Sequence, residues 1–368
     1  MKENKKHSKI IISGGGTGGH IFPALAIANQ IKKVLPNAEI LFVGSKDRME
    51  MEKVPAAGYP IKGLWIAGIN RAKLWKNYAF PFQLISSLFK ASSIIKKFKP
   101  AAVIGTGGFA SGPILYMAQK SNIPTFIQEQ NSYPGITNKL LSKNARKIYT
   151  AYDGLDKFFN KEKIVKTGNP IRKELYNINV NKQEAAAKFG LDDKHKTILI
   201  VGGSLGARPI NEAIESILSD LIKRQYQVLW QTGKNGFENY KKHQQELVKV
   251  VPFIPNMKDA YALADIIISR AGAGTISELS LIGKPVILVP SPYVAEDHQT
   301  KNAQALAKVN AAVLINEKDI EKELLPSIIN LFSDKDVYQK MCDNIKEMAQ
   351  ANATEDIVNS ILQEINKK

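Results

Sequence analysis

Cysteine is nearly absent from this sequence, since Cys342 is the only one among 368 residues. A single thiol cannot form an internal disulfide or a cysteine cage around a metal ion, and such sparse usage is typical of a reducing cytosol. We interpret Cys342 as a small buried hydrophobe on a late helix.

Long apolar runs are also missing, because none reaches the roughly 18 residues that a membrane-spanning helix requires. The opening MKENKKHSK leads straight into an apolar β-branched run rather than into a signal-peptide core, so we expect the protein to stay where it is made. No Asp-x-Asp follows an expected strand, and no His/Asp cluster has metal-ligand spacing. The sequence therefore predicts neither a metal site nor another cofactor, and it disfavours a transferase that clamps a diphosphate through a metal ion.

Acidic residues are scarce in the first half of the chain. Residues 1–165 hold 25 Lys and Arg against 9 Asp and Glu, whereas residues 166–368 hold 26 against 25, so almost all of the net charge of +17 lies in the first half. A generic basic surface does not explain so uneven a split. The first half is expected to face a polyanion, either nucleic acid or an anionic lipid surface.

One segment, 66–99, interleaves basic residues with aromatic and aliphatic ones and contains no acid. Its cations are Arg71, Lys73, Lys76, Lys90, Lys96, Lys97 and Lys99. This pattern is typical of an element that lies on an anionic bilayer, although an ordinary amphipathic helix packed on a sheet explains part of it equally well. RNA-binding signatures are missing, so we expect an anionic membrane surface and no nucleic acid as partner.

The length favours two domains, and apolar β-branched runs alternate with helical periodicity throughout, which predicts an α/β fold with parallel sheets. We expect a first domain over 1–166, a second over 167–345 and a final helical stretch over 346–368. Strands are expected at 10–13, 40–43, 102–105, 125–128, 147–150, 197–201, 227–231, 248–253, 265–269, 286–289 and 312–315.

Each half opens with an apolar strand, a glycine loop and a helix, over 10–20 and over 198–208. Two such Rossmann-like domains bind ligands at the carboxyl ends of their strands, so we expect both sheets to face one cleft. The first loop matches Gly-x-Gly-x-x-Gly, but the acidic residue that a dinucleotide ribose requires is replaced by Val43-Gly44, which disfavours hydride transfer.

His20 directly follows the first loop, where an imidazole could accept a proton from a sugar hydroxyl near neutral pH. A capping or packing histidine is the competing interpretation. In the second loop, 202–206, Ser204 and backbone N–H groups suit a diphosphate, although a glycine turn required by steric crowding fits equally well.

A third glycine loop follows the strand at 265–269, and Glu278 is expected on the first turn of the next helix, where it would cap that helix or bind a ribose. The polar run Glu296–Asn302 would either contact sugar hydroxyls or simply begin a helix.

Taken together, seven motifs in order resemble a known enzyme family. They are GGGTGGH at 14–20, GTGGFASGP at 105–113, EQN at 129–131 with PGITNK at 134–139, GNPIR at 168–172, GGSLGAR at 202–208, SRAGAGTISE at 269–278 and EDHQTKNA at 296–303. The chain is thereby similar to the bacterial transferases that add N-acetylglucosamine to the lipid-linked muramyl-pentapeptide precursor of peptidoglycan.

That resemblance implies a two-domain GT-B architecture, with UDP-N-acetylglucosamine (UDP-GlcNAc) held mainly by the second domain and the lipid-linked acceptor, lipid I, approaching the first. It implies that His20 is the catalytic base and that the donor contacts are Thr17, Gly18, Gly19, Asn131, Arg172, Ser204, Ile254, Ala273, Gly274, Thr275, Glu278 and Gln299. It implies that Gly107, Gly108 and Asn138 lie on the side of the site that binds the acceptor. His298 departs from the family pattern, which has a second glutamine in some relatives, and the final helix is expected to return to the first domain.

The expected activity is therefore an inverting transfer of N-acetylglucosamine to lipid I at the cytoplasmic face of the cell membrane. A UDP-GlcNAc 2-epimerase of the same architecture is one alternative. A nucleotide-sugar or nucleic-acid binding protein without turnover is the other.

Overall fold

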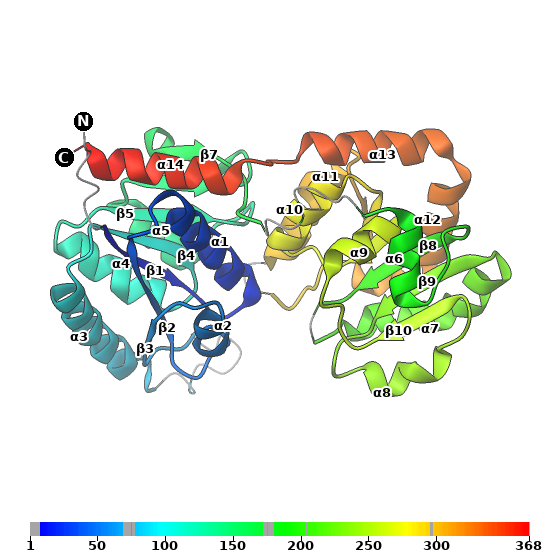
Figure 1. The fold of residues 1–368 in the computed structure, drawn as a ribbon, viewed down its shortest axis with the longest axis horizontal. Coiled ribbons are helices and arrows are strands. Elements are labelled where there is room, and N and C mark those ends of the chain that lie inside the picture. Colours follow the sequence, from blue (N-terminus) through cyan, green and yellow to red (C-terminus); the bar gives the residue numbers. More distant parts are fainter. Residues whose placement is uncertain are drawn as a thin grey trace. The chain divides into compact units, whose positions relative to one another are not determined.

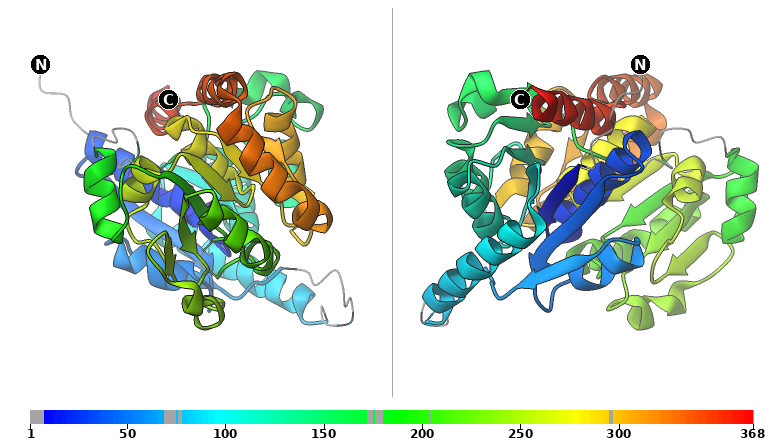
Figure 2. Two further views of the ribbon diagram at one scale, coloured as in Figure 1. Left: turned by 90° about the vertical axis from the view of Figure 1, so that its right-hand side faces the viewer. Right: turned by 60° about the vertical axis from the view of Figure 1, so that its left-hand side comes forward.

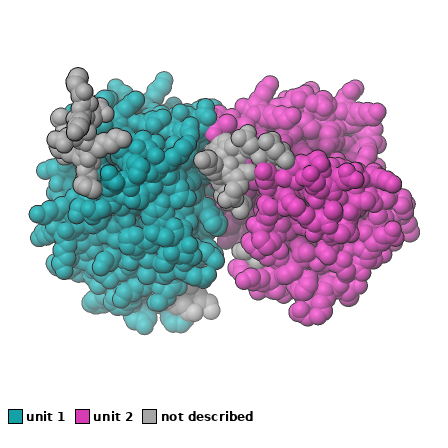
Figure 3. Space-filling model, in the orientation of Figure 1, with its two compact units in different colours: residues 1–172, 352–368 teal, residues 173–351 magenta. Residues whose placement is uncertain are grey.

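The computed structural model describes residues 8–68, 75, 78–171, 175, 180–203, 205–294 and 297–367. The chain divides into two compact units, which Figure 3 shows in different colours: unit 1 comprises 1–172 with 352–368, and unit 2 comprises 173–351. The boundaries expected from the sequence were 166/167 and 345/346.

Among the described residues, unit 1 contains a parallel sheet of seven strands in the order β3-β2-β1-β4-β5-β6-β7. The strands are β1 (Lys9–Gly14), β2 (Glu39–Ser45), β3 (Ile61–Leu64), β4 (Ala102–Gly107), β5 (Thr125–Glu129), β6 (Lys147–Thr150) and β7 (Ile164–Lys166). Ile11 lies opposite Leu41 on one side and Val103 on the other, which fixes the register at the centre of the sheet.

Helices cover both faces of this sheet, as Figures 1 and 2 show. They are α1 (Gly18–Val34), α2 (Glu50–Ala56), α3 (Phe80–Phe98), α4 (Ser111–Lys120), α5 (Ile136–Ser142) and α14 (Ala353–Asn366). Because strand side chains alternate between faces, Ile10 and Ile12 pack with α1 and α14, whereas Ile11 packs with α3 and α4. In Figure 1 the red helix α14 lies along the dark blue helix α1.

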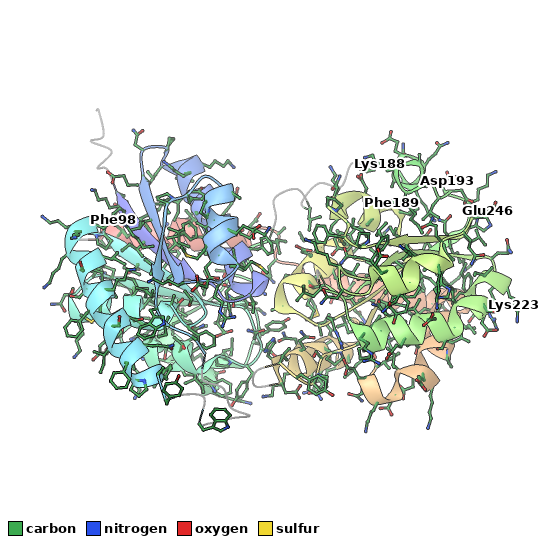
Figure 4. All side chains as sticks on the ribbon, turned by 90° about the horizontal axis from the view of Figure 1, so that it is seen from below. Phe98, Lys188, Phe189, Asp193, Lys223 and Glu246 are labelled. Carbon is green, nitrogen blue, oxygen red and sulfur yellow. The ribbon has the colours of Figure 1, made fainter. Side chains whose placement is uncertain are left out.

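Unit 2 repeats the same plan with a parallel sheet of six strands in its described part, in the order β10-β9-β8-β11-β12-β13. The strands are β8 (Lys196–Val201), β9 (Tyr226–Gln231), β10 (Val248–Val251), β11 (Ile266–Ser269), β12 (Val286–Leu288) and β13 (Val313–Leu314). The helices are α6 (Lys182–Phe189), α7 (Arg208–Lys223), α8 (Phe237–Tyr240), α9 (Met257–Leu263), α10 (Ala273–Ile282), α11 (His298–Ala307), α12 (Ile320–Ser333) and α13 (Lys335–Glu347). Figure 4 labels the last residues of three helices, Phe98 of α3, Phe189 of α6 and Lys223 of α7.

Both strand orders are those of the doubly wound Rossmann fold, with the central strand first in the chain. The topological switch point lies between β1 and β4 in unit 1 and between β8 and β11 in unit 2. The predicted α/β class with two Rossmann-like domains and parallel sheets is therefore confirmed. In such sheets, ligands bind beyond the carboxyl ends of the strands next to the switch point.

All eleven strands expected from the sequence are present, with ends that differ by a few residues. Strand β10 stops at Val251 rather than at Phe253, because Pro252 has no N–H to donate to a neighbouring strand. Strands β3 and β7 were not among the expected strands. Strand β3 is only 4 residues long and includes Lys62 and Gly63, which hide its apolar pattern. Strand β7 has only 3 residues.

Candidate active site

The glycine loop after β1 packs closely against the loop after β4. The N–H of Gly15 donates to the carbonyl of Gly107 over 3.3 Å. Gly108 has a φ of +88°, and a Cβ at that position would lie 2.3 Å from the carbonyl oxygen of Gly15. Gly107 and Gly108, expected on the acceptor side, thus have a packing role as glycines, and a contact with acceptor stays a prediction.

A buried carboxylate that the sequence did not reveal holds this loop from the other side. Glu50, at the start of α2, is 0% exposed. Its Oε2 accepts the N–H of Gly16 over 2.8 Å, and its Oε1 accepts the N–H of Ser45 over 2.9 Å. Glu50 therefore joins the end of β2 to the loop that leads to Thr17, Gly18 and Gly19, the expected donor contacts.

His20 lies in the first turn of α1, which begins at Gly18 with Thr17 as its N-cap. Its ring Nδ1 lies 2.9 Å from the carbonyl oxygen of Thr106 and 3.0 Å from Oε1 of Gln130. The ring therefore contacts the carboxyl ends of β4 and β5 and does not cap its own helix. Gly107 allows this approach, since a Cβ there would lie 2.6 Å from Nδ1.

The motif after β5 is organised by a second buried carboxylate, Glu129, which is 1% exposed. Its Oε1 accepts the backbone N–H of Asn131 over 3.0 Å, and its Oε2 accepts from the side-chain amide of Asn138 over 2.8 Å. Asn138 is 4% exposed, and its Oδ1 is buried without a partner among the described residues. Asn131 thus has a fixed backbone, while Asn138 supports the start of α5.

In unit 2, the loop after β8 is tied to the end of β9. Gln231, which is 2% exposed, donates through Nε2 to the carbonyl of Gly203 over 3.1 Å and accepts the N–H of Ile254 over 2.9 Å. Gly206 has a φ of +87°, and a Cβ there would lie 2.1 Å from the carbonyl oxygen of Thr232. Steric crowding thus requires glycine at 206, and a contact of this loop with a diphosphate stays a prediction. Of the expected site residues, Ser204 and Arg172 lie outside the described residues, as does Glu296.

Helix α10 presents its N-terminus beyond the carboxyl end of β11. Gly272 is the N-cap and Ala273, Gly274 and Thr275 form the first turn. The first N–H groups of a helix have no partner within that helix and carry partial positive charge, which suits a phosphate.

The expectation that Glu278 lies on the first turn of this helix is wrong. Because α10 begins at Ala273 and a turn holds about 3.6 residues, Glu278 lies in the second turn. It is too far along the helix to cap it. Its Oε2 instead accepts from the hydroxyl of Tyr261 over 3.2 Å.

Gln299 lies at the start of α11, and its Oε1 accepts the N–H of Ser291 over 2.9 Å. Asp297 precedes the helix with a φ of +49° and accepts from the hydroxyl of Thr300 over 2.7 Å. This part of the polar run therefore does begin a helix, and the contact of Gln299 with a sugar stays a prediction.

Outside these loops, helices α3, α4 and α5 of unit 1 expose large apolar side chains. On α3, Phe82 is 69%, Ile85 54% and Phe89 74% exposed, at a spacing that places all three on one face. Tyr116 of α4 and Leu140 of α5 are 44% and 68% exposed. We call these five residues the α3–α5 surface. Arg71, Lys73 and Lys76 of the basic segment lie outside the described residues, and no described helix is both long and apolar enough to cross a bilayer.

Comparison with known proteins relates this geometry to a family. Residues 10–150 match the glycosyltransferase family 28 N-terminal domain, and residues 197–359 match the C-terminal domain of the same family. The structure superposes on that of MurG from Acinetobacter baumannii with a TM-score of 0.76 and 29% identity, covering 97% of this chain and 99% of the other. The calicheamicin glycosyltransferase CalG4 (TM-score 0.74, 12% identity) and a UDP-N-acetylglucosamine 2-epimerase (TM-score 0.67, 16% identity) share the fold.

Two relatives carry the name UDP-N-acetylglucosamine–N-acetylmuramyl-(pentapeptide) pyrophosphoryl-undecaprenol N-acetylglucosamine transferase. The one from Christiangramia forsetii is 52% identical over 99% of this chain and 100% of its own length. The one from Flavobacterium psychrophilum is 54% identical over 96% of this chain and 97% of its own. The chain therefore belongs to glycosyltransferase family 28, and within it to the family of these N-acetylglucosamine transferases.

Proposed function

We propose that the protein transfers N-acetylglucosamine from UDP-GlcNAc to the C4 hydroxyl of the muramyl residue of lipid I, undecaprenyl-pyrophosphoryl-MurNAc-pentapeptide, and so forms lipid II. The observation that carries this proposal is the identity of 52% to 54% with transferases of that name over nearly the whole chain. The seven ordered motifs supply the residues for each role.

In this proposal, His20 is the general base of unit 1. It takes the proton from the C4 hydroxyl while that oxygen attacks C1 of N-acetylglucosamine. The bond from C1 to the UDP oxygen breaks in the same step, so the configuration inverts and a β-1,4 linkage forms. Asn131 and Gln299 contact the donor sugar, and Thr17, Gly18 and Gly19 lie near its diphosphate.

The departing UDP carries the negative charge that develops in the transition state. We assign its stabilisation to the N-terminus of α10, at Ala273, Gly274 and Thr275, and to the loop around Ser204. Arg172, Ile254 and Glu278 complete the uridine and phosphate contacts. Glu278, in the second turn of α10, accepts a hydrogen bond from the hydroxyl of Tyr261 in α9, so its carboxylate is positioned before a ligand binds.

The decisive experiment incubates the protein with UDP-GlcNAc labelled in the sugar and with a lipid I analogue. We expect label to enter the lipid phase with stoichiometric release of UDP. Label that is converted to another nucleotide sugar without any lipid present would instead identify a 2-epimerase. Binding of the nucleotide sugar with no turnover would support the non-catalytic alternative.

We also propose that the protein works as a peripheral protein on the cytoplasmic face of the cell membrane, with the α3–α5 surface against the anionic leaflet. Exposed large apolar side chains that gather on neighbouring helices commonly mark sites of association. Lysines lie on the same helices: the Nζ of Lys120 lies 5.7 Å from the ring centre of Tyr116, and Lys96, Lys97 and Lys99 end α3 or follow it. Protein that stays in the supernatant with anionic vesicles under all conditions would contradict this proposal.

A further inference from the structure

A chain of buried amide side chains leads away from His20, and none of these side chains has a role in the proposed reaction. Gln128 is 0%, Gln130 2% and Asn169 3% exposed. They come from β5, from the residue that follows it and from the loop after β7. Buried amides in direct contact must agree on which end donates and which end accepts, so their directions can be worked out in order.

Asn169 sets the direction at the far end. Its Nδ2 donates to the main-chain carbonyl of Gln130 over 3.1 Å, and a carbonyl can only accept. The Oδ1 of Asn169 therefore faces Gln128 and accepts from its Nε2 over 2.9 Å. The oxygen of Gln128 then faces Gln130 and accepts from that amide nitrogen.

The orientation of the Gln130 amide determines which of its atoms faces His20. Its Nε2 also lies 2.6 Å from the carbonyl oxygen of Thr106 and 3.3 Å from that of Gln128. Turning this amide around would place its oxygen against several oxygens, with no hydrogen between them. The Oε1 of Gln130 is therefore the end that faces Nδ1 of His20, at 3.0 Å.

Both neighbours of Nδ1 are thus acceptors, since the other is the carbonyl of Thr106 at 2.9 Å. We infer that the Asn169–Gln128–Gln130 chain, with the Thr106 carbonyl, holds His20 as the Nδ1–H tautomer, and that Gln130 is a positioning residue for it. The lone pair of the neutral ring then lies on Nε2. One consequence of this inference rests on the proposed function: Nε2 is the atom that takes the proton, and Nδ1–H keeps its two partners in the imidazolium that forms.

The tautomer can be measured directly in the full chain. We would label the histidines with ¹⁵N and record long-range ¹H–¹⁵N spectra at a pH where the ring is neutral, assigning His20 by the signals that disappear in His20→Gln. We expect the pattern of a protonated Nδ1 and an unprotonated Nε2. The opposite pattern in the unaltered protein would overturn the inference, and this test requires no variant of the amide chain to fold.

Gln130→Met keeps the length of the side chain and removes the acceptor from Nδ1. We expect the Nδ1–H fraction to fall and kcat to drop about 5- to 10-fold, as the loss of one neutral hydrogen bond predicts, with an unchanged KM for UDP-GlcNAc. Gln119→Met is the matched control. Gln119 is a partly buried amide of the same unit that donates to Thr125 and Leu141 and does not touch His20.

Two results separate this inference from the proposed function. An unchanged tautomer and an unchanged kcat in Gln130→Met would overturn the positioning role of Gln130. A shifted tautomer with an unchanged kcat would support that role and would show that His20 is not the base. If Gln130→Met does not fold, Gln128→Met tests the same chain one residue further from the ring.

Discussion

At the scale of single residues, His20 carries the sharpest functional prediction. A positioned general base typically contributes about 10² to 10⁴ in rate, so we expect His20→Ala to lose kcat over that range. Binding of UDP-GlcNAc should persist, because Nδ1 of His20 is occupied by Thr106 and Gln130 within unit 1. Titration calorimetry and initial rates measure the two effects. The control is His195→Ala, which should keep its turnover because His195 pairs with Asp192 in unit 2. Near-normal turnover of His20→Ala would show that His20 is not the general base.

Lys284 gives a prediction of pH dependence. Burial, followed by the charge of Lys182, lowers the pKa of Lys284 to about 8, although Asp265 acts in the opposite direction. Below pH 8 the amine of Lys284 is protonated in both the folded and the unfolded state. Between pH 8 and about 10 the unfolded chain still binds this proton and the folded chain does not, so the free energy of unfolding rises with pH, by up to about 3 kcal/mol.

Urea unfolding at a series of pH values tests this expectation. Lys284→Met should flatten the rise between pH 8 and 10, because no proton is then bound or released at that site. The exposed Lys308→Met should retain it. A rise of equal size in Lys284→Met would assign the pH dependence to other groups.

Residue-scale contacts are also where the sequence predicted least. The glycine loops, His20 and the order of the motifs could be found in the sequence because each is local. Glu50 could not, since its partner Gly16 lies 34 residues away and an acidic residue at the start of a helix looks ordinary. Gln231, which joins Gly203 to Ile254, was missed for the same reason.

At the scale of elements, the exposed face of α3 predicts binding to a lipid surface. Burial of one aromatic side chain contributes about 1.5 to 3 kcal/mol, so Phe82→Ser with Phe89→Ser should weaken association with anionic vesicles by at least about tenfold for each side chain. Co-sedimentation measures the affinity. Tyr293→Ser is the control, because Tyr293 is 89% exposed but lies in unit 2. Equal binding of the double variant and the unaltered protein would exclude this face as the contact.

The last helix, α14, is expected to stabilise unit 1. Ile357, Val358 and Ile361 are 0% exposed in the same core as residues of α1, and the hydroxyl of Tyr149 donates to Oγ of Ser360 over 3.0 Å. Ile357→Ala should therefore lower the free energy of unfolding by about 2 to 5 kcal/mol. The neighbouring exposed Asn359→Ala should change it by less than about 0.5 kcal/mol. Urea unfolding measures the free energy of unfolding of both variants. A loss in Ile357→Ala as small as that in Asn359→Ala would mean that α14 contributes little to stability.

Element boundaries were predicted well where an apolar run was long and poorly where it was short. The central strands β1, β4, β8 and β11 are buried on both faces and appear in the sequence as uninterrupted apolar runs. The short strands β3 and β7 were missed. The start of α10 was placed too late, because a glycine-rich loop does not reveal which of its residues begins the helix. That single error moved Glu278 from the second turn to the first.

At the scale of the whole molecule, the uneven charge predicts a salt effect. Residues 1–165 hold nearly all of the net charge of +17, and screening between charges grows as the Debye length falls from about 10 Å at 0.1 M to about 3 Å at 1 M salt. Binding to anionic vesicles should weaken steeply over that range, and binding to neutral vesicles should change little. Salt-sensitive binding to RNA but not to vesicles would point to a nucleic-acid partner instead.

The return of α14 to unit 1 has a consequence for how the chain is made. In the sequence, unit 2 (173–351) lies between the two parts of unit 1, so a ribosome synthesises all of unit 2 before it synthesises α14, the helix that packs against α1. The half that is translated first is thus completed last. Until α14 has been synthesised, the apolar side chains of unit 1 that pack in one core with Ile357 and Ile361 are exposed to solvent on the nascent chain. We expect a chaperone to bind the chain most strongly in this interval.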